Sequence, residues 1–241
     1  YVAQQIASLP GRLKTSFDPI LGPVITQSLA AGDRAAVAAQ VRQVGFWIMA
    51  AQGCLALMGS IPGEAVMGTV GPQFVAGTAA LAFLLIAEVL AATASVSESA
   101  LIYVARHRNL LISGVMLGVQ VGLSFAFIMV MRRLGWPQSY QAAGPALALM
   151  VSLALTSFVK STLLARLLGA RVSGWRWQLA GAALVAVAVG TIFTSLPHRL
   201  EWAELVFGLP AIAGSYLFIL WRFAFRAEDR ALFARMPRAG G

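Results

Sequence analysis

Long apolar runs separated by short polar segments dominate the pattern of the chain, and no segment shows the alternation of a half-buried strand. A run of about 18 or more apolar residues can cross a bilayer core of about 30 Å as a helix. The pattern therefore predicts an all-α fold, a polytopic membrane helix bundle. Its about seven expected transmembrane helices are residues 2–30, Val44–Ile61, Phe74–Val104, Leu110–Met131, Ala143–Leu168, Leu179–Phe193 and Leu205–Phe225.

The first segment, residues 2–30, is the least apolar of the seven and contains Pro10-Gly11, Pro19 and Pro23. Proline removes a backbone hydrogen bond, so we expect this helix to be interrupted or kinked. Gln5 and Arg12 project toward the same side as Pro19 and Pro23. Interrupted helices of transporters mark regions that bend or bind, which makes this segment a candidate part of a substrate pathway.

Composition and charge support a membrane protein. Apolar residues make up 59% of the chain and charged residues 11%, whereas a soluble domain carries roughly a quarter charged residues. The net charge of +9 does not indicate a nucleic-acid partner, because the basic residues lie at the ends of the apolar runs. Cys54 is the only cysteine, so no disulfide can form within the chain.

The distribution of Lys and Arg predicts the orientation. Basic residues gather in alternate loops, near Arg34, Arg106 and Arg171, and in the tail after Arg226. The positive-inside rule places these segments in the cytoplasm. The pair Arg132-Arg133 departs from the alternation. We expect a multi-pass protein of a bacterial inner (cytoplasmic) membrane that begins outside and ends with a cytoplasmic C-terminus.

Ionisable groups at membrane depth are costly, so they usually face a cavity or a partner. Glu88 is the deepest of them, and Ser95 and Ser99 lie on the same face of the predicted helix. Glu98 falls to one side of this stripe, nearer the cytoplasmic end. Glu88 is either a cavity-facing carboxylate that binds a proton, a cation or a sugar hydroxyl, or a structural carboxyl held by a neighbouring helix.

Three basic residues lie within the predicted helices, and each has two interpretations. Arg12 and Lys14 attract the phosphates of a lipid-linked sugar, or they reach lipid headgroups from the interfacial zone, with Lys14 paired to Asp18. Lys160 lies about 12 Å from the cytoplasmic end of its helix, so it faces a cavity or extends to the interface.

Two further features concern packing and chemistry. Gly114, Gly118 and Gly122 recur at every fourth residue and predict a face on which another helix packs closely. The only histidines, His107 and His198, lie in predicted loops, so the sequence indicates no metal site, no cofactor and no catalytic residue.

Three segments follow one another in a recognisable order. A Pro-containing helix leads to a Gly-Asp loop, a long helix ends in a basic turn, and a Gly-Trp turn opens the next helix. The segments are Phe17–Asp33, Ala105–Arg108 and Leu134–Ala148. In order and spacing they resemble the polysaccharide-biosynthesis (lipid-linked oligosaccharide, O-antigen) flippases of the multidrug/oligosaccharidyl-lipid/polysaccharide exporter superfamily. The resemblance covers about residues 1–170. It departs from the family where Ala142-Ala143 precede Gly144-Pro145, and the last two helices occur only in some branches.

The resemblance implies a fold of two six-helix lobes around a central cavity. The chain would supply the C-terminal lobe of a MATE-like transporter without its first helix (residues 1–170), two additional transmembrane helices (171–226) and a basic cytoplasmic tail (227–241). Such proteins move a polyprenyl-diphosphate-linked oligosaccharide across the inner membrane by alternating access, for lipopolysaccharide or exopolysaccharide synthesis. The family implies a cationic cavity for the diphosphate. The implied partners are membrane lipid, the lipid-linked oligosaccharide and the missing N-terminal lobe of the same chain.

The sequence thus predicts a flippase and not an enzyme, with a substrate pathway formed by Arg12, Lys14, Glu88, Ser95, Lys160 and Gln5. One alternative is a small-molecule or drug exporter of the same fold, which would have a more apolar cavity. The other is a membrane-embedded glycan-modifying enzyme, which would require a sizeable polar loop or an intramembrane histidine.

Overall fold

The computed structural model describes residues 2–195, 202, 204–226 and 229, and gives the backbone alone for residues 9–10, 12–21, 24, 138–140 and 142. Every regular element in this part of the chain is a helix. The elements are α1 (Val2–Ala30), α2 (Arg34–Ser60), α3 (Gly63–Val70), η1 (Pro72–Gly77), α4 (Thr78–Val104), α5 (Arg106–Arg133), α6 (Gln138–Leu168), α7 (Trp177–Thr194) and α9 (Leu209–Ile219). The π-helical turns η3 (Glu204–Gly208) and η4 (Leu220–Ala224) extend α9 at both ends.

Six helices among the described residues are long and apolar enough to cross a membrane: Arg34–Ser60, Pro72–Val104, Arg106–Arg133, Ala143–Leu168, Trp177–Thr194 and Glu204–Ala224. The predicted all-α polytopic bundle is therefore confirmed. Helix α1 occupies the residues expected of the first segment but is not among these six spans. It runs as one helix from Val2 to Ala30, so the interruptions expected at its prolines do not divide it.

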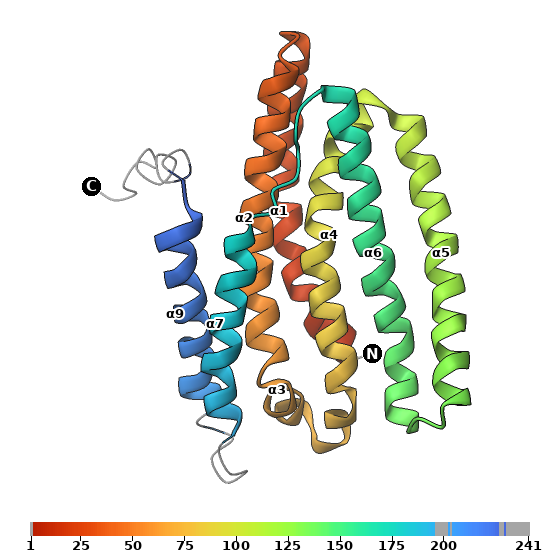
Figure 1. Ribbon diagram of the computed structural model, residues 1–241, viewed down its shortest axis with the longest axis vertical. Helices are drawn as coiled ribbons and strands as arrows, with labels where there is room; N and C mark the ends of the chain where they lie inside the picture. Colours follow the sequence, from red (N-terminus) through yellow and green to blue (C-terminus); the bar gives the residue numbers. More distant parts are fainter. Residues whose placement is uncertain (1, 196–201, 203, 227–228, 230–241) are drawn as a thin grey trace.

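The helices lie in a staggered row, with α5 at one edge and α9 at the other (Figure 1). Helix α6 packs between α4 and α5, and its contact with α4 is the most extensive among the described elements. On the other side of α4 lie α1 and α2, and the pair α7 and α9 packs against α2. The two helices expected as additions to the lobe thus join the bundle through α2.

One continuous core connects α1, α2, α4, α6, α7 and the last helix, and its buried residues include many alanines (Ala38, Ala50, Ala92, Ala100, Ala182, Ala186). Small side chains let helix backbones approach closely, which is how membrane helices gain packing contacts without a hydrophobic effect between them. Helix α5 contributes no residue to this core. Many of its apolar side chains are instead exposed, as expected of a surface that faces lipid or another protein segment.

The glycine face of α5 lies open in the described part of the chain. No described atom lies within 4 Å of a Cβ placed on Gly114, Gly118 or Gly122, so no helix of the described chain packs closely there. Among the described residues no helix fills this face, because α6 contacts α5 through another face of the helix.

An ion pair anchors the end of the last helix. Arg176, in the connection before α7, bonds Asp229 with 2.7 Å between Nη1 and Oδ2, and also donates to the backbone carbonyl of Ala224. Its guanidinium lies 3.7 Å from the centre of the Phe46 ring on α2. Gln43 of α2 donates to the other Asp229 oxygen at 3.3 Å. We call these residues the C-terminal anchor, because they join α2, the α6–α7 connection and the chain after η4.

The electrostatics of the anchor favour an ionised Asp229. Burial by itself raises the pKa of this carboxyl. The hydrogen bond and the positive charge of Arg176, together with hydrogen bonds from the Arg226 backbone N–H and from Gln43, outweigh burial and hold the pKa below its usual value. The predicted tail, residues 227–241, otherwise lies outside the described residues.

We predict that Gly53→Ala destabilises the bundle by about 1–3 kcal/mol, because overpacking forces a shift. A Cβ at position 53 would lie 2.5 Å from the hydroxyl oxygen of Tyr216, which is buried between α2 and α9. Thermal unfolding of the purified protein measures this. Adding Tyr216→Phe should recover most of the loss, and Gly118→Ala, whose Cβ meets open space, should cause none. Equal stability of Gly53→Ala and the parent would contradict the α2–α9 packing.

We also predict that Asp229→Asn lowers the unfolding temperature at neutral pH, because removing one partner of a buried ion pair costs about 3–5 kcal/mol. Since the folded-state pKa of Asp229 is lowered, its stabilisation is complete above the unfolded pKa and is lost as the pH falls through the folded value. The difference from the parent should therefore begin to narrow below about pH 4 and vanish once the pH is below the folded pKa. Glu64→Gln, which removes an exposed carboxylate on α3, is the control. A difference that is constant with pH would exclude the ionised anchor.

Candidate functional site

A polar pocket of about 350 Å³ lies between α2, α4, α5 and α6. Its volume is within the range of about 300–1,000 Å³ that small-molecule sites occupy. Three ionisable side chains line it together with amides and hydroxyls. The lining residues are Gln52 of α2; Glu88, Ala91, Ala92, Ala94, Ser95 and Glu98 of α4; Ser113, Met116, Leu117 and Gln120 of α5; and Ser152, Leu153, Thr156 and Lys160 of α6.

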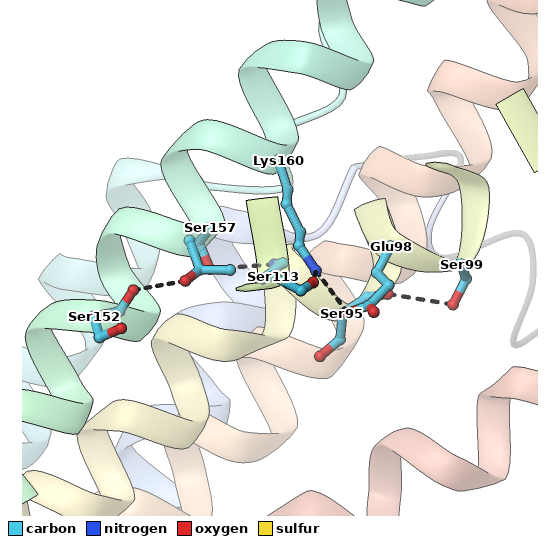
Figure 2. A network of polar contacts seen from close by, with 9 residues as sticks. Ser95, Glu98, Ser99, Ser113, Ser152, Ser157 and Lys160 are labelled. Carbon is cyan, nitrogen blue, oxygen red and sulfur yellow. Dashed lines mark hydrogen bonds and ion pairs between the residues drawn. The ribbon is translucent and has the colours of Figure 1, made fainter. Parts of the chain in front are cut away.

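Lys160 joins three helices at one end of this pocket. Its ammonium lies 2.9 Å from Oε2 of Glu98 on α4 and 2.9 Å from the hydroxyl oxygen of Ser113 on α5. Figure 2 shows the side chain extending from α6 toward both partners. The Lys160 side chain is 3% exposed, whereas that of Glu98 is 42% exposed. The lysine charge is therefore compensated inside the protein, while the carboxylate remains open to the pocket.

The two faces of α4 carry opposite chemistry. Glu88, Ala91, Ser95 and Glu98 follow one face of the helix and line the polar pocket. The opposite face carries Ile86, Val89 and Leu90, which line an apolar hollow of about 210 Å³ against α2, α7 and Tyr216. The polar side chains are thus separated from the apolar side of the bundle by the thickness of one helix.

Serine hydroxyls of α6 fix the positions of the pocket walls. Ser157 donates to the backbone carbonyl of Leu90 and accepts from the backbone N–H of Ala94 at 3.2 Å, so it ties α6 to α4. Ser152 donates to the backbone carbonyl of Met116 at 3.2 Å and ties α6 to α5. Bonds from side chain to backbone hold adjacent membrane helices together where no water is present to satisfy these groups.

Glu88 lies at the α1 side of the pocket. A Cβ placed on Gly11 would lie 3.2 Å from Oε2 of Glu88, so the carboxylate is close to the α1 backbone. Glycine at this position lets α1 and the Glu88 carboxylate approach each other. Glu88 therefore lines the pocket, as expected of a cavity-facing carboxylate. It also lies at the α1–α4 contact, as expected of a structural carboxyl.

The structure brings Glu88, Ser95 and Lys160 of the predicted pathway into one pocket. Gln5 is exposed on α1 and does not line the pocket. Arg12 and Lys14 lie on α1, but their side chains are outside the described residues. Ser99 of the predicted stripe also does not line the pocket and donates to the backbone carbonyl of Ser95 at 3.2 Å.

Several lining residues were missed by the sequence analysis. Glu98 was placed beside the polar stripe, yet it is the ion-pair partner of Lys160. A signal for the α6 wall was present, because Ser152, Thr156 and Lys160 are spaced by four residues and therefore follow one helix face. Ser113 and Gln120 lie seven residues apart on α5 and therefore share one face of that helix. Only the packing shows that these stripes face one another.

The pocket can bind a polar group by hydrogen bonds at membrane depth. Amides and hydroxyls both donate and accept, and the carboxylates accept. Among the described residues, no three His, Cys, Asp or Glu side chains gather as a metal site would require. These residues can therefore hold a polar group reversibly by hydrogen bonds and charge.

The chain matches no protein-family model, no curated protein and no solved structure. The fold and the pocket therefore define its class: it is a multi-pass α-helical membrane protein with a polar pocket among its helices. The resemblance to the flippases stays a prediction.

The burial difference within the ion pair predicts an asymmetry between its two neutral variants. Glu98→Gln leaves the buried Lys160 ammonium uncompensated and should cost about 3 kcal/mol. Lys160→Met leaves a carboxylate that is open to the pocket and should cost less, about 1 kcal/mol. The double variant should be more stable than Glu98→Gln alone. Thermal unfolding of the four proteins measures this, and equal losses in both single variants would show that the pair is not arranged as described.

Proposed function

We propose that the chain is part of a flippase that moves a polyprenyl-diphosphate-linked oligosaccharide across the bacterial inner membrane for surface polysaccharide synthesis. The observation that supports this proposal best is the polar pocket, whose Lys160–Glu98 pair and neighbouring amides lie among helices with apolar outer surfaces. A membrane protein maintains such groups at depth where a polar ligand or water passes.

The arrangement also fits one half of a two-lobed transporter. The pocket lies between α4 and α5, which touch each other little, while both pack on α6. Helix α5 leaves its own apolar face exposed beside the pocket. A second lobe against this side would enclose the pocket as a central passage. In this proposal the C-terminus is cytoplasmic, and the substrate reaches the pocket alternately from the two leaflets.

The polar lining favours this function over export of apolar drugs by the same fold. A site for apolar drugs carries a small number of polar groups, whereas this lining contains two carboxylates, an ammonium, two amides and several hydroxyls. In our proposal Glu88 and Lys160 act on the substrate within the pocket. Arg12 of α1 interacts with the diphosphate or with headgroups, as the sequence predicts.

Export of surface polysaccharide in a strain that lacks the chromosomal gene tests the proposal. In the full-length protein we expect Glu88→Gln, Lys160→Met and Arg12→Ala each to reduce export at least about tenfold, the effect of about 1.4 kcal/mol of lost transition-state stabilisation. Glu64→Gln, outside the pocket on α3, should export normally. Expression must be equal in all strains, as measured by immunoblot of the membrane fraction. Normal export by all three pocket and α1 variants would contradict these assignments.

A further inference from the structure

The charge balance of the pocket bears on which part of a lipid-linked sugar it receives. Lys160 is the only cationic side chain among the described lining residues, and its ammonium is already bonded to Glu98. A second carboxylate, Glu88, also lines the pocket. A diphosphate would have to displace Glu98 from Lys160 or place its negative charges beside the Glu98 carboxylate, which repels them.

The remaining lining suits an uncharged group with many hydroxyls. Gln52 and Gln120 contribute amides, and Ser95 and Thr156 contribute hydroxyls. These groups donate and accept hydrogen bonds, as the hydroxyls of a sugar do. Apolar side chains alternate with them and can contact the C–H faces of a sugar ring; they are Ala91, Ala92, Ala94, Met116, Leu117 and Leu153.

The volume of the pocket also favours a small group with many hydroxyls as the ligand. A volume of about 350 Å³ lies near the lower limit of small-molecule sites. It accommodates a group of that size and not a whole lipid-linked oligosaccharide. We propose that this pocket binds a neutral, hydroxyl-rich sugar unit of the carrier, and that the diphosphate binds outside it. This inference rests on the proposed function and departs from the cationic cavity that the family resemblance implies.

Charge-selective thiol labelling of the full-length protein in lipid nanodiscs tests this inference. Gln120→Cys places a thiol in the pocket, and Val121→Cys places one on the apolar exposed face of α5. The native Cys54 is buried, so the protein without a new cysteine gives the blank rate. The reagents are a trimethylammonium and a sulfonate methanethiosulfonate. Each rate is divided by that reagent's rate with 2-mercaptoethanol.

In the Gln120→Cys protein we expect the cationic reagent to react at least as fast as the anionic one. Adding Glu98→Gln frees the charge of Lys160 and should shift the ratio about tenfold toward the anionic reagent. Adding Lys160→Met should shift it by a similar factor in the opposite direction. The Val121→Cys protein should react with neither reagent above the blank rate. A preference for the anionic reagent in the Gln120→Cys protein itself would overturn the inference, because it would show a pocket suited to a diphosphate.

Protection from labelling identifies the class of ligand. We expect the neutral disaccharide diacetylchitobiose to slow labelling of the thiol at position 120, and pyrophosphate at equal concentration to have no effect. Protection by pyrophosphate alone would overturn the sugar assignment and leave the proposed flippase function intact. Labelling of the Gln120→Cys protein no faster than the blank would contradict both, because a pocket that no aqueous reagent reaches cannot carry a polar substrate.

Discussion

The energetic cost of placing charged groups among membrane helices is the constraint on which the rest of this structure depends. A lone ammonium in hydrocarbon is strongly disfavoured. Lys160 lies within a candidate span and is 3% exposed, and its charge is met by Glu98 and by the Ser113 hydroxyl. Because these partners come from two other helices, the position of one side chain links the packing of α4, α5 and α6. The same contacts therefore position these three helices and form one end of the polar pocket.

Helix α6 holds this arrangement in place through short side chains. Ser157 bonds the α4 backbone and Ser152 bonds the α5 backbone, so the two walls of the pocket are fixed to the helix between them. Farther away, the C-terminal anchor of Arg176 and Asp229 holds the last helix against α2. The apolar face of α4 packs toward that side, while its polar face lines the pocket. A single helix thus separates a tightly packed half of the bundle from a polar one.

Most of the fold could be predicted from the sequence, because apolar length alone identifies membrane helices. The α4 residues Glu88 and Ser95 could likewise be identified, since a polar residue in an apolar run stands out. The role of Glu98 could not, because its angle from Glu88 on one helix says nothing about where α6 places Lys160. Periodicity describes the faces of a helix, whereas a pocket depends on how neighbouring helices are rotated. The same limit applies at Gly114, Gly118 and Gly122, where the sequence shows a small-residue face but does not show which segment would pack on it.

We infer that water or a polar ligand, and not lipid, occupies the pocket at membrane depth. Spin labels on α6 of the full-length protein in lipid test it most directly, with one at Leu153 in the pocket and one at Leu155, which is exposed outside it. We expect a water-soluble nickel complex to relax the label at 153, and oxygen, which is concentrated in hydrocarbon, to relax the label at 155. Relaxation of both labels by oxygen alone would show that lipid, and not water, occupies the pocket.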